Sequence, residues 1–277
     1  MLVNDDSADA SEEVCIGLFQ KYSGVIRFYS LSKNVGEHNA VMAGLNKVTG
    51  DYALIMDDDF QNPVSEVVKL VDVAVKHQYD VVYSYYGKKR HSLFRNMGTW
   101  FNDQVANMVL NKPKGLYLSS FKVISRFLVK EIVHYRAPFP YIDGMILQIT
   151  DNIGTVKVEH RDRRVGHSGY NLPKLVSLWS NMLTNFSILP LRVSVFLGFF
   201  FSLIGVIFGI STIFEKISNP DLPVGYAAVI VAICFFVGIQ LLVLGMVGEY
   251  VGRIFLCLNR KPQFTIKKSF EADADPP

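Results

Sequence analysis

Residues 52–59 decide the fold, and they read Tyr52-Ala53-Leu54-Ile55-Met56-Asp57-Asp58-Asp59. The first five have the character of a buried strand, and the three acids close that apolar run. On an extended segment, residues two apart point to the same face. We therefore expect Asp57 and Asp59 to aim together, with Asp58 turned away. Two neighbouring carboxylates repel each other unless a cation lies between them.

Two interpretations of these acids stay open at this point. In the first, Asp57 and Asp59 bind a divalent cation through oxygen ligands, and a nucleotide diphosphate completes its coordination shell. The carboxyl end of a parallel strand is where open α/β sheets bind ligands, which suits this interpretation. In the second, the acids form an ordinary strand-to-helix turn, in which Asn62 caps a helix and Pro63 takes its first position.

Residues 1 to about 170 alternate between strand-like and helix-like patterns. This alternation is typical of an α/β domain with a mostly parallel sheet. We expect strands near 1–3, 25–31, 52–56, 80–85 and 156–160. Helical patterns cover residues 11–22, 37–48, 64–77, 93–110 and 122–134.

The C-terminal part of the chain has a different composition. The 277 residues are 50% hydrophobic with a mean hydropathy of +0.23, which is too apolar for an ordinary soluble domain. Residues 193–214 and 225–248 carry no charge, and roughly 20 apolar residues span a bilayer. Before them, apolar side chains that include Trp179 recur at helical spacing. This segment predicts an amphipathic helix in the membrane interface, ended by Pro190.

Charge and cysteine placement predict the orientation and the redox state. Net charge is only +3, but basic residues precede the first span and follow the second. The positive-inside rule then places both termini in the cytoplasm, and residues 1–22 do not read as a signal peptide. Cys15, Cys234 and Cys257 form no spaced set, so we expect free thiols without a disulfide framework or zinc site.

Several segments match the motifs of one known family in order and spacing. Residues 3–9 resemble V-D-D-G-S-x-D, residues 34–45 resemble N-x-G-x-x-x-A-x-x-A-G-L, residues 57–63 are close to D-A-D-L-Q-D-P, and residues 248–253 resemble G-E-Y-I-G-R. Together they make the chain similar to the polyprenyl-phosphate glycosyltransferases of glycosyltransferase family 2. That resemblance covers nearly the full length.

The resemblance implies roles for individual residues. The metal on the donor diphosphate would be held by Asp57, Asp59 and Gln61, as Mg²⁺ or Mn²⁺. The donor nucleotide sugar would also be bound by Asp5, at the base, and by Lys122 and Ser168. Catalysis would use Asp59 with two basic residues on the acceptor phosphate, Arg95 and Arg163.

The sequence departs from the family pattern in places. Lys122 stands where relatives usually have arginine, which keeps the charge but loses the bidentate fork. Gly169 replaces a lysine of the R-x-x-G-x-S-K-Y motif. Relatives begin with a further strand, so we expect the sheet to lack its first strand. Asp143 could contact the sugar or be a turn acid, and the turn is the favoured interpretation.

By resemblance, the chain is a GT-A-like (Rossmann-like) enzyme of the bacterial inner membrane that glycosylates undecaprenyl phosphate. We expect residues 1–172 to form the cytoplasmic catalytic domain, 173–192 the amphipathic helix, 193–257 two transmembrane helices, and 258–277 a cytoplasmic tail. Relatives form tetramers, and no nucleic-acid partner is expected. The first rival, a processive polysaccharide synthase, carries a Q-x-x-R-W motif not seen here. The second is a catalytically inactive membrane scaffold or flippase partner.

Overall fold

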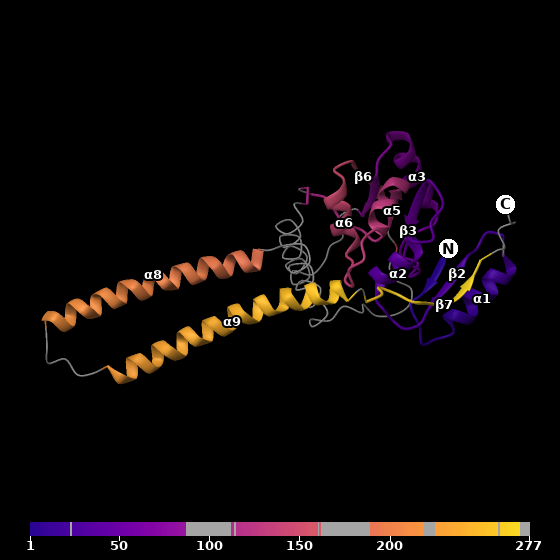
Figure 1. Cartoon of the computed structure of the whole chain (residues 1–277). Helices are drawn as coiled ribbons and strands as arrows, with labels where there is room; N and C mark the ends of the chain where they lie inside the picture. Colours follow the sequence, from indigo (N-terminus) through magenta and orange to yellow (C-terminus); the bar gives the residue numbers. More distant parts are fainter. Residues whose placement is uncertain are drawn as a thin grey trace. The chain divides into compact units, whose positions relative to one another are not determined.

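The computed structural model describes residues 1–22, 24–86, 112–113, 115–159, 161, 189–218, 225–259 and 261–271 (Figure 1). The chain divides into two compact units. One comprises Met1–Met182 together with Asn259–Pro277, and the other comprises Leu183–Leu258. The first unit therefore takes in chain from both ends of the sequence.

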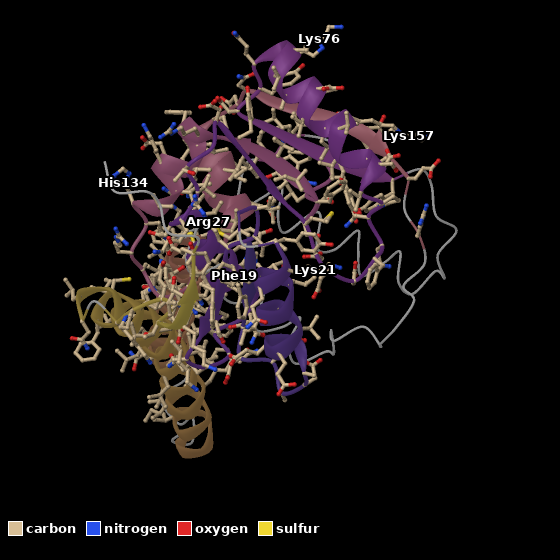
Figure 2. All side chains as sticks on the ribbon, turned by 90° about the vertical axis from the view of Figure 1, so that its right-hand side faces the viewer. Phe19, Lys21, Arg27, Lys76, His134 and Lys157 are labelled. Carbon is tan, nitrogen blue, oxygen red and sulfur yellow. The ribbon has the colours of Figure 1, made fainter. Side chains whose placement is uncertain are left out.

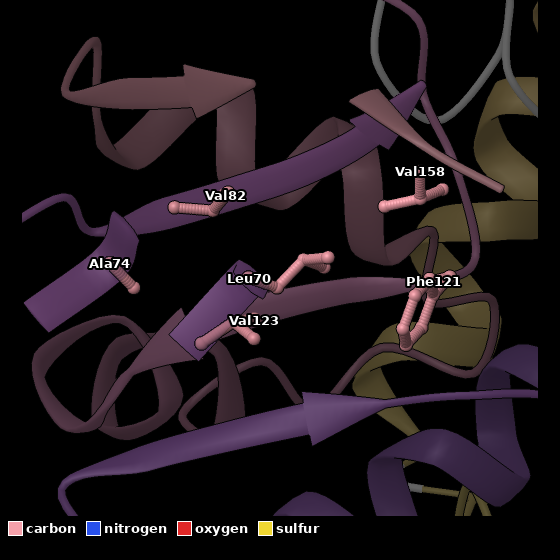
Figure 3. Packing of buried hydrophobic residues seen from close by; sticks show 6 residues of the cluster. All are labelled: Leu70, Ala74, Val82, Phe121, Val123 and Val158. Carbon is pink, nitrogen blue, oxygen red and sulfur yellow. The ribbon is translucent and has the colours of Figure 1, made fainter. Parts of the chain in front are cut away.

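A four-stranded sheet forms one half of the first unit. Its strands follow the order β3-β5-β4-β6, and they span Tyr52–Ile55, Lys122–Ser125, Val81–Tyr86 and Ile153–Val158 respectively. Helix α3 (Ser65–His77) packs on one face of it. The core between them is apolar and is shown in Figure 3: Leu70, Ala74, Val82, Phe121, Val123 and Val158. Burying such side chains stabilises the sheet by roughly 1.5–3 kcal/mol each.

The opposite face of this sheet carries polar side chains. Successive strand residues point to opposite faces, so Tyr83 and Lys122 turn away from the core that holds Val82 and Val123. Both side chains contact Asp143 in the first turn of α6 (Ile142–Ile149). Helix α5 (Arg126–Val133) packs against α6. One face of the sheet thus packs against α3, and the other buries a charged pair among apolar residues.

A three-stranded sheet forms the other half of the unit, in the order β1-β2-β7. Its strands are Leu2–Asn4, Phe28–Leu31 and Ile266–Phe270. The helices packed against it are α1 (Ser11–Lys21) and α2 (Glu37–Leu45). Figure 1 shows β7, near the C-terminus, lying beside β2 from the start of the chain. Part of the expected tail at 258–277 is therefore a strand of the domain, which the sequence patterns did not predict.

A cavity of about 560 Å³ lies between the two sheets. Its lining includes Met1 and Val3 from the β1 side, Tyr52–Met56 from the β3 side, and residues of α2. In the part of the chain that the structure describes, β1 pairs only with β2, and β3 only with β5. Among the described strands, the two sheets are therefore not joined by a pairing between β1 and β3.

The α/β class is confirmed, but two details were wrong. Parallel pairing joins β1 to β2 and β4 to β6, whereas β5 runs antiparallel to β3 and β4, and β7 antiparallel to β2. The pairings are therefore mixed rather than mostly parallel. Residues 122–134 are not one helix either. The first four form β5, and Ser125 caps α5 by accepting a hydrogen bond from the Leu128 amide at 3.3 Å.

The second unit contains two long apolar helices, α8 (Leu189–Ser218) and α9 (Tyr226–Leu258). Within them, Leu189–Ser211 and Phe235–Leu258 are long and apolar enough to cross a membrane, and only 6% and 0% of the most apolar windows are buried. A core helix of a soluble protein would bury its apolar stripe, so both are candidate spans. Pro190 is the second described residue of α8, and the segment that it was expected to end lies outside the described residues.

Candidate active site

The candidate site lies at the carboxyl end of β3, beside the start of β5. In the antiparallel pairing Ile55, the last residue of β3, is opposite Lys122, the first residue of β5. The Ser120 hydroxyl, two residues before Lys122, donates to Asp57 Oδ2 at 2.6 Å. This bond fixes the Asp57 carboxylate against β5 and leaves its other oxygen unused by Ser120.

The three acids face different neighbours. Asp57 contacts Ser120 and raises the pKa of Glu37, whereas Asp58 raises the pKa of Cys15 on α1 as a cause secondary to burial. The two acids thus have different neighbours. The extended backbone assumed in the prediction that Asp58 turns away from Asp57 and Asp59 is absent, because β3 ends at Ile55 and the chain bends at 58–60.

The bend after β3 positions Asp59. Phe60 adopts a left-handed φ of 60°, which is uncommon for a bulky residue and costs of order 1–3 kcal/mol. Asp59 Oδ1 accepts a hydrogen bond from the Gln61 backbone amide at 3.1 Å. The Gln61 carbonyl in turn accepts from the Arg161 amide at 2.9 Å. Segments from two parts of the chain therefore hold the 59–61 loop in place.

The metal set expected from the resemblance offers only oxygen ligands. Asp57, Asp59 and Gln61 supply two carboxylates and one amide, a chemistry that fits Mg²⁺ or Mn²⁺. Among the described residues, no group of three or more His, Cys, Asp or Glu side chains could hold a metal by itself. The two carboxylates and the amide would leave the other positions of such an ion to a bound molecule or water.

A buried charged group lies on the same face of the sheet. Lys122 is only 4% exposed, and its ammonium pairs with the Asp143 carboxylate. The Tyr83 hydroxyl donates to the same oxygen, Asp143 Oδ1, at 2.9 Å. The interpretation of Asp143 as a turn acid is thus wrong, because it is buried in the first turn of α6 with two partners. By contrast, Lys76 and Lys157 are exposed, and Figure 2 shows both at the periphery.

Two residues at the start of α2 have pKa values that are shifted by burial and by the charges of Lys122 and Asp143. The pKa of Glu37 is raised, first by burial and then by the Asp57 charge, with a smaller contribution from Asp143. Burial lowers the pKa of His38, which keeps the imidazole neutral near pH 7, and its ring meets Tyr141 edge-on at 5.2 Å. Four elements therefore converge here: α2, the end of β3, the start of β5 and the first turn of α6.

Asp5 has a structural task in this conformation. Its carboxylate accepts from the Val35 and Gly36 amides, both at 2.8 Å, and its carbonyl accepts from the Asn34 side chain at 2.9 Å. Gly36 has φ +87°, which a side chain would strain. Asp5 thereby fixes the turn into α2, so both of its carboxylate oxygens already have partners before any nucleotide base binds.

Three site residues suggested by the resemblance lie outside the described residues: Arg95, Arg163 and Ser168. Their roles stay predictions. The structure adds Tyr83 and Glu37, which the sequence did not single out. Tyr83 reads as one aromatic in an apolar strand, and only the pairing of β4 with β5 brings it to Lys122.

Comparison with known proteins gives matches over both units. Residues 1–133 match the model of glycosyl transferase family 2, and residues 189–254 match that of the GtrB C-terminal hairpin. Undecaprenyl-phosphate 4-deoxy-4-formamido-L-arabinose transferases from Yersinia pestis (strain Pestoides F) and Yersinia pseudotuberculosis serotype O:3 (strain YPIII) are each 29% identical over 275 residues. The match covers 99% of this chain and 84% of each relative.

Among solved structures, glucosyl-3-phosphoglycerate synthase from Mycobacterium tuberculosis with Mn²⁺, UDP-glucose and phosphoglyceric acid is 18% identical, with a TM-score of 0.47. The match covers 66% of this chain and 65% of that one.

The α/β domain, its acidic loop and the family match define the chain as a glycosyltransferase. More particularly, it carries a family 2 glycosyltransferase domain followed by a GtrB-type C-terminal hairpin.

Proposed function

We propose that this protein transfers a sugar from a nucleotide-sugar donor to undecaprenyl phosphate, or a closely similar polyprenyl phosphate. The observation that carries the proposal is the similarity to undecaprenyl-phosphate transferases over 99% of the chain, including both candidate spans. A lipid phosphate lies at headgroup level, so a transferase that uses it needs a membrane attachment. The paired apolar helices supply one.

The acceptor chemistry suits the residues present. A phosphate monoester has its second pKa near about 6, so it is largely dianionic at neutral pH and needs little help from a general base. Its oxygen attacks the anomeric carbon from the face opposite the leaving group. The bond from that carbon to the nucleoside diphosphate breaks, and the configuration inverts. The remaining tasks are to neutralise the leaving group and to align two anions.

Specific residues are proposed for these tasks. Asp57, Asp59 and Gln61 hold a Mg²⁺ or Mn²⁺ ion, which neutralises charge on the donor diphosphate when bound. Asp5, Lys122 and Ser168 serve the donor side, and Asp5 does so in part by ordering the turn into α2. Arg95 and Arg163 are assigned to the acceptor phosphate.

The proposed location is the bacterial inner membrane, with both termini and the catalytic domain in the cytoplasm. The charge pattern around the spans supports this orientation, because the link at 215–224 carries one lysine against two acids. The product, a lipid-linked sugar, suits the modification of cell-envelope or O-antigen glycans. A homotetramer is proposed from the family resemblance.

The test is transfer of labelled sugar from a panel of UDP-, GDP- and dTDP-sugars to undecaprenyl phosphate, in membranes that contain the full chain. We expect a lipid-linked product from one donor. Asp59→Ala should lower its rate at least about 100-fold, because the metal that neutralises the donor diphosphate loses one of its ligands. A chelator should abolish the product, and Mg²⁺ or Mn²⁺ should restore it.

The neighbouring Asp58→Ala is the matched control. It removes a carboxylate from the same loop, but the Asp58 side chain is exposed and is not one of the proposed metal ligands. Its rate should stay within about twofold of wild type, as is usual for surface substitutions away from a site. No product from any donor with a folded, inserted protein would contradict the proposal and favour the inactive-scaffold rival. The lack of a pairing between β1 and β3 among the described strands is the observation that favours that rival.

A further inference from the structure

The pair formed by Lys122 and Asp143 is unusual for the interior of a domain. The lysine is 4% exposed and the aspartate 8% exposed, so both charges are largely removed from water. The ammonium also lies 5.4 Å from the centre of the Tyr83 ring, and the Tyr83 hydroxyl bonds Asp143 at 2.9 Å. Three side chains from β4, β5 and α6 therefore support one another.

Stability alone gives no reason for this pair. Burying two charges carries a desolvation penalty that their mutual attraction offsets only with good geometry. Replacing such a pair by apolar side chains of similar size is often neutral or stabilising. The surrounding positions on the same face are already apolar, since Val81 and Ile124 are fully buried. An apolar pair would fit the site at least as well.

The pair lies on the face of the sheet that carries the candidate site. Lys122 is opposite both Ile55 and Tyr83 in the strand pairing. Ser120 lies two residues before Lys122, at the bend that leads into β5, and its hydroxyl donates to Asp57 at 2.6 Å. The same segment of chain therefore carries the contact with Asp57 and the buried ammonium.

The charges of the pair reach the neighbouring site residues. Besides burial and Asp57, both Lys122 and Asp143 influence the pKa of Glu37, in opposite directions. The same two charges act on His38, again in opposite directions, after the larger effect of burial. The pair and Asp57 thus act on the same carboxyl group, that of Glu37, so the pair is not an isolated feature of the core.

We infer that Lys122 and Asp143 form one positioning unit for the transfer, in which Asp143, fixed by Tyr83, holds the Lys122 ammonium on the face of the sheet that carries Asp57. A positive charge held in advance next to two anionic substrates stabilises developing charge without reorganising during the reaction. Asp143 and Tyr83 act through Lys122, so both are positioning residues. The inference rests on the proposed function.

The deciding experiment compares two ways of removing the pair in the full chain, in membranes. Asp143→Asn leaves the ammonium buried without its counter-ion, so both Tm and kcat should fall. The double variant Lys122→Met with Asp143→Leu removes both charges at similar volume. Its Tm should return to near the wild-type value, while its kcat should stay about 10- to 100-fold low. A double variant with wild-type kcat would overturn the inference and leave the pair a purely structural one.

Two further variants separate positioning from packing. Lys122→Arg keeps the positive charge but changes the shape of the side chain. If the charge is what matters, this variant should retain most of the transfer rate; if close packing is what matters, it should not. Glu66→Gln breaks another pair with a buried acid, Glu66 with Lys69 on α3, on the far side of the sheet. It should lower Tm without changing kcat or the KM for donor. A Glu66→Gln variant with reduced kcat would mean that lost stability, not lost position, explains the other results.

If the double variant does not fold, Tyr83→Phe decides the question. It keeps the ring over the ammonium and removes only the hydroxyl that fixes Asp143. We expect kcat to fall several-fold with an unchanged KM for donor, and an unchanged kcat would contradict the inference. The wild-type protein serves as the reference: no product from it refutes the proposed function and this inference together, whereas equal rates in wild type and variants refute this inference alone.

Discussion

The two sheets of the catalytic unit differ in where their strands come from. The four-stranded sheet uses strands that lie between residues 52 and 158, and it presents Asp57, Ser120, Lys122 and Tyr83. The three-stranded sheet takes two strands from the first 31 residues and its third from β7, which follows the last apolar helix. The described polar side chains around Asp57 thus come mostly from the sheet built by residues 52–158. The other sheet needs β7, which follows the last apolar helix.

The attachment of β7 combines apolar and polar contacts. The Phe270 ring lies 5.7 Å from the Phe28 ring and 5.7 Å from the Phe19 ring. Lys268 pairs with Glu12 of α1. Before the strand, the Gln263 side chain donates to the Tyr135 and Ala137 carbonyls at 3.0 and 2.7 Å. The residues after α9 are therefore an integral part of the domain, and they connect it directly to the candidate span.

The largest effect is expected from Leu70→Ala in the four-stranded sheet. Leu70 is fully buried between α3 and the strands, so the free energy of unfolding should fall by about 3–5 kcal/mol. Denaturant titration of the full chain in detergent measures this loss. Hydrogen exchange should show that amides of β4 and β5 lose protection while those of β2 and β7 keep theirs. Equal loss of protection in both sheets would show that they unfold as one unit. The two sheets would then not be stabilised independently.

A smaller effect is expected from Phe270→Ala in the three-stranded sheet. The ring packs against Phe19 and Phe28 but stays partly exposed, so we expect a loss of about 2–3 kcal/mol. Amides of β2 and β7 should lose protection, and those of β5 should not. Phe127→Ala on α5 is the matched control, since that ring is 53% exposed and its removal should change stability by no more than about 0.5 kcal/mol.

The sequence predicted local features well and long-range pairing poorly. The strand before Asp57, the helix at 65–77 and both apolar helices followed from periodicity and composition. The antiparallel placement of β5 did not, because strand order and direction depend on contacts between segments far apart in the chain. The same holds for β7, whose Ile-Lys-Lys-Ser-Phe sequence reads as a charged tail until β2 supplies its partner.

The candidate site shows the same division. Asp57, Asp59 and Gln61 were found from a short motif, because their spacing is local. Asp143 was misinterpreted, since one acid in the sequence Tyr141-Ile142-Asp143-Gly144 gives no sign of a buried lysine 21 residues earlier. Pairing of β4 with β5, followed by packing of α6 on their shared face, creates that contact. Site residues that depend on such assembly need the structure to be recognised.

The smallest effect is expected at the edge of the three-stranded sheet, from Glu12. Its hydrogen bonds to Lys268 and then to Ser30 lower its pKa below the ordinary value of 4.5. A carboxyl whose folded pKa is lowered stabilises the fold above its unfolded pKa, and this contribution is lost as pH falls through the folded pKa. Protection of the β7 amides, corrected for intrinsic exchange, should therefore decrease in wild type from about pH 6 to about pH 3.5.

Glu12→Gln separates this titration from other acid effects. The amide cannot ionise, so the β7 amides of the variant should start with lower protection and change little over the same pH range. Glu13→Gln removes the next charge along α1 and should behave like wild type, since Lys268 contacts Glu12. If protection of β7 falls equally with acid in Glu12→Gln and in wild type, the contact with Lys268 does not hold the strand. The aromatic contacts of Phe270 would then account for the attachment of β7. The three-stranded sheet, like the four-stranded sheet, would be held together by apolar packing.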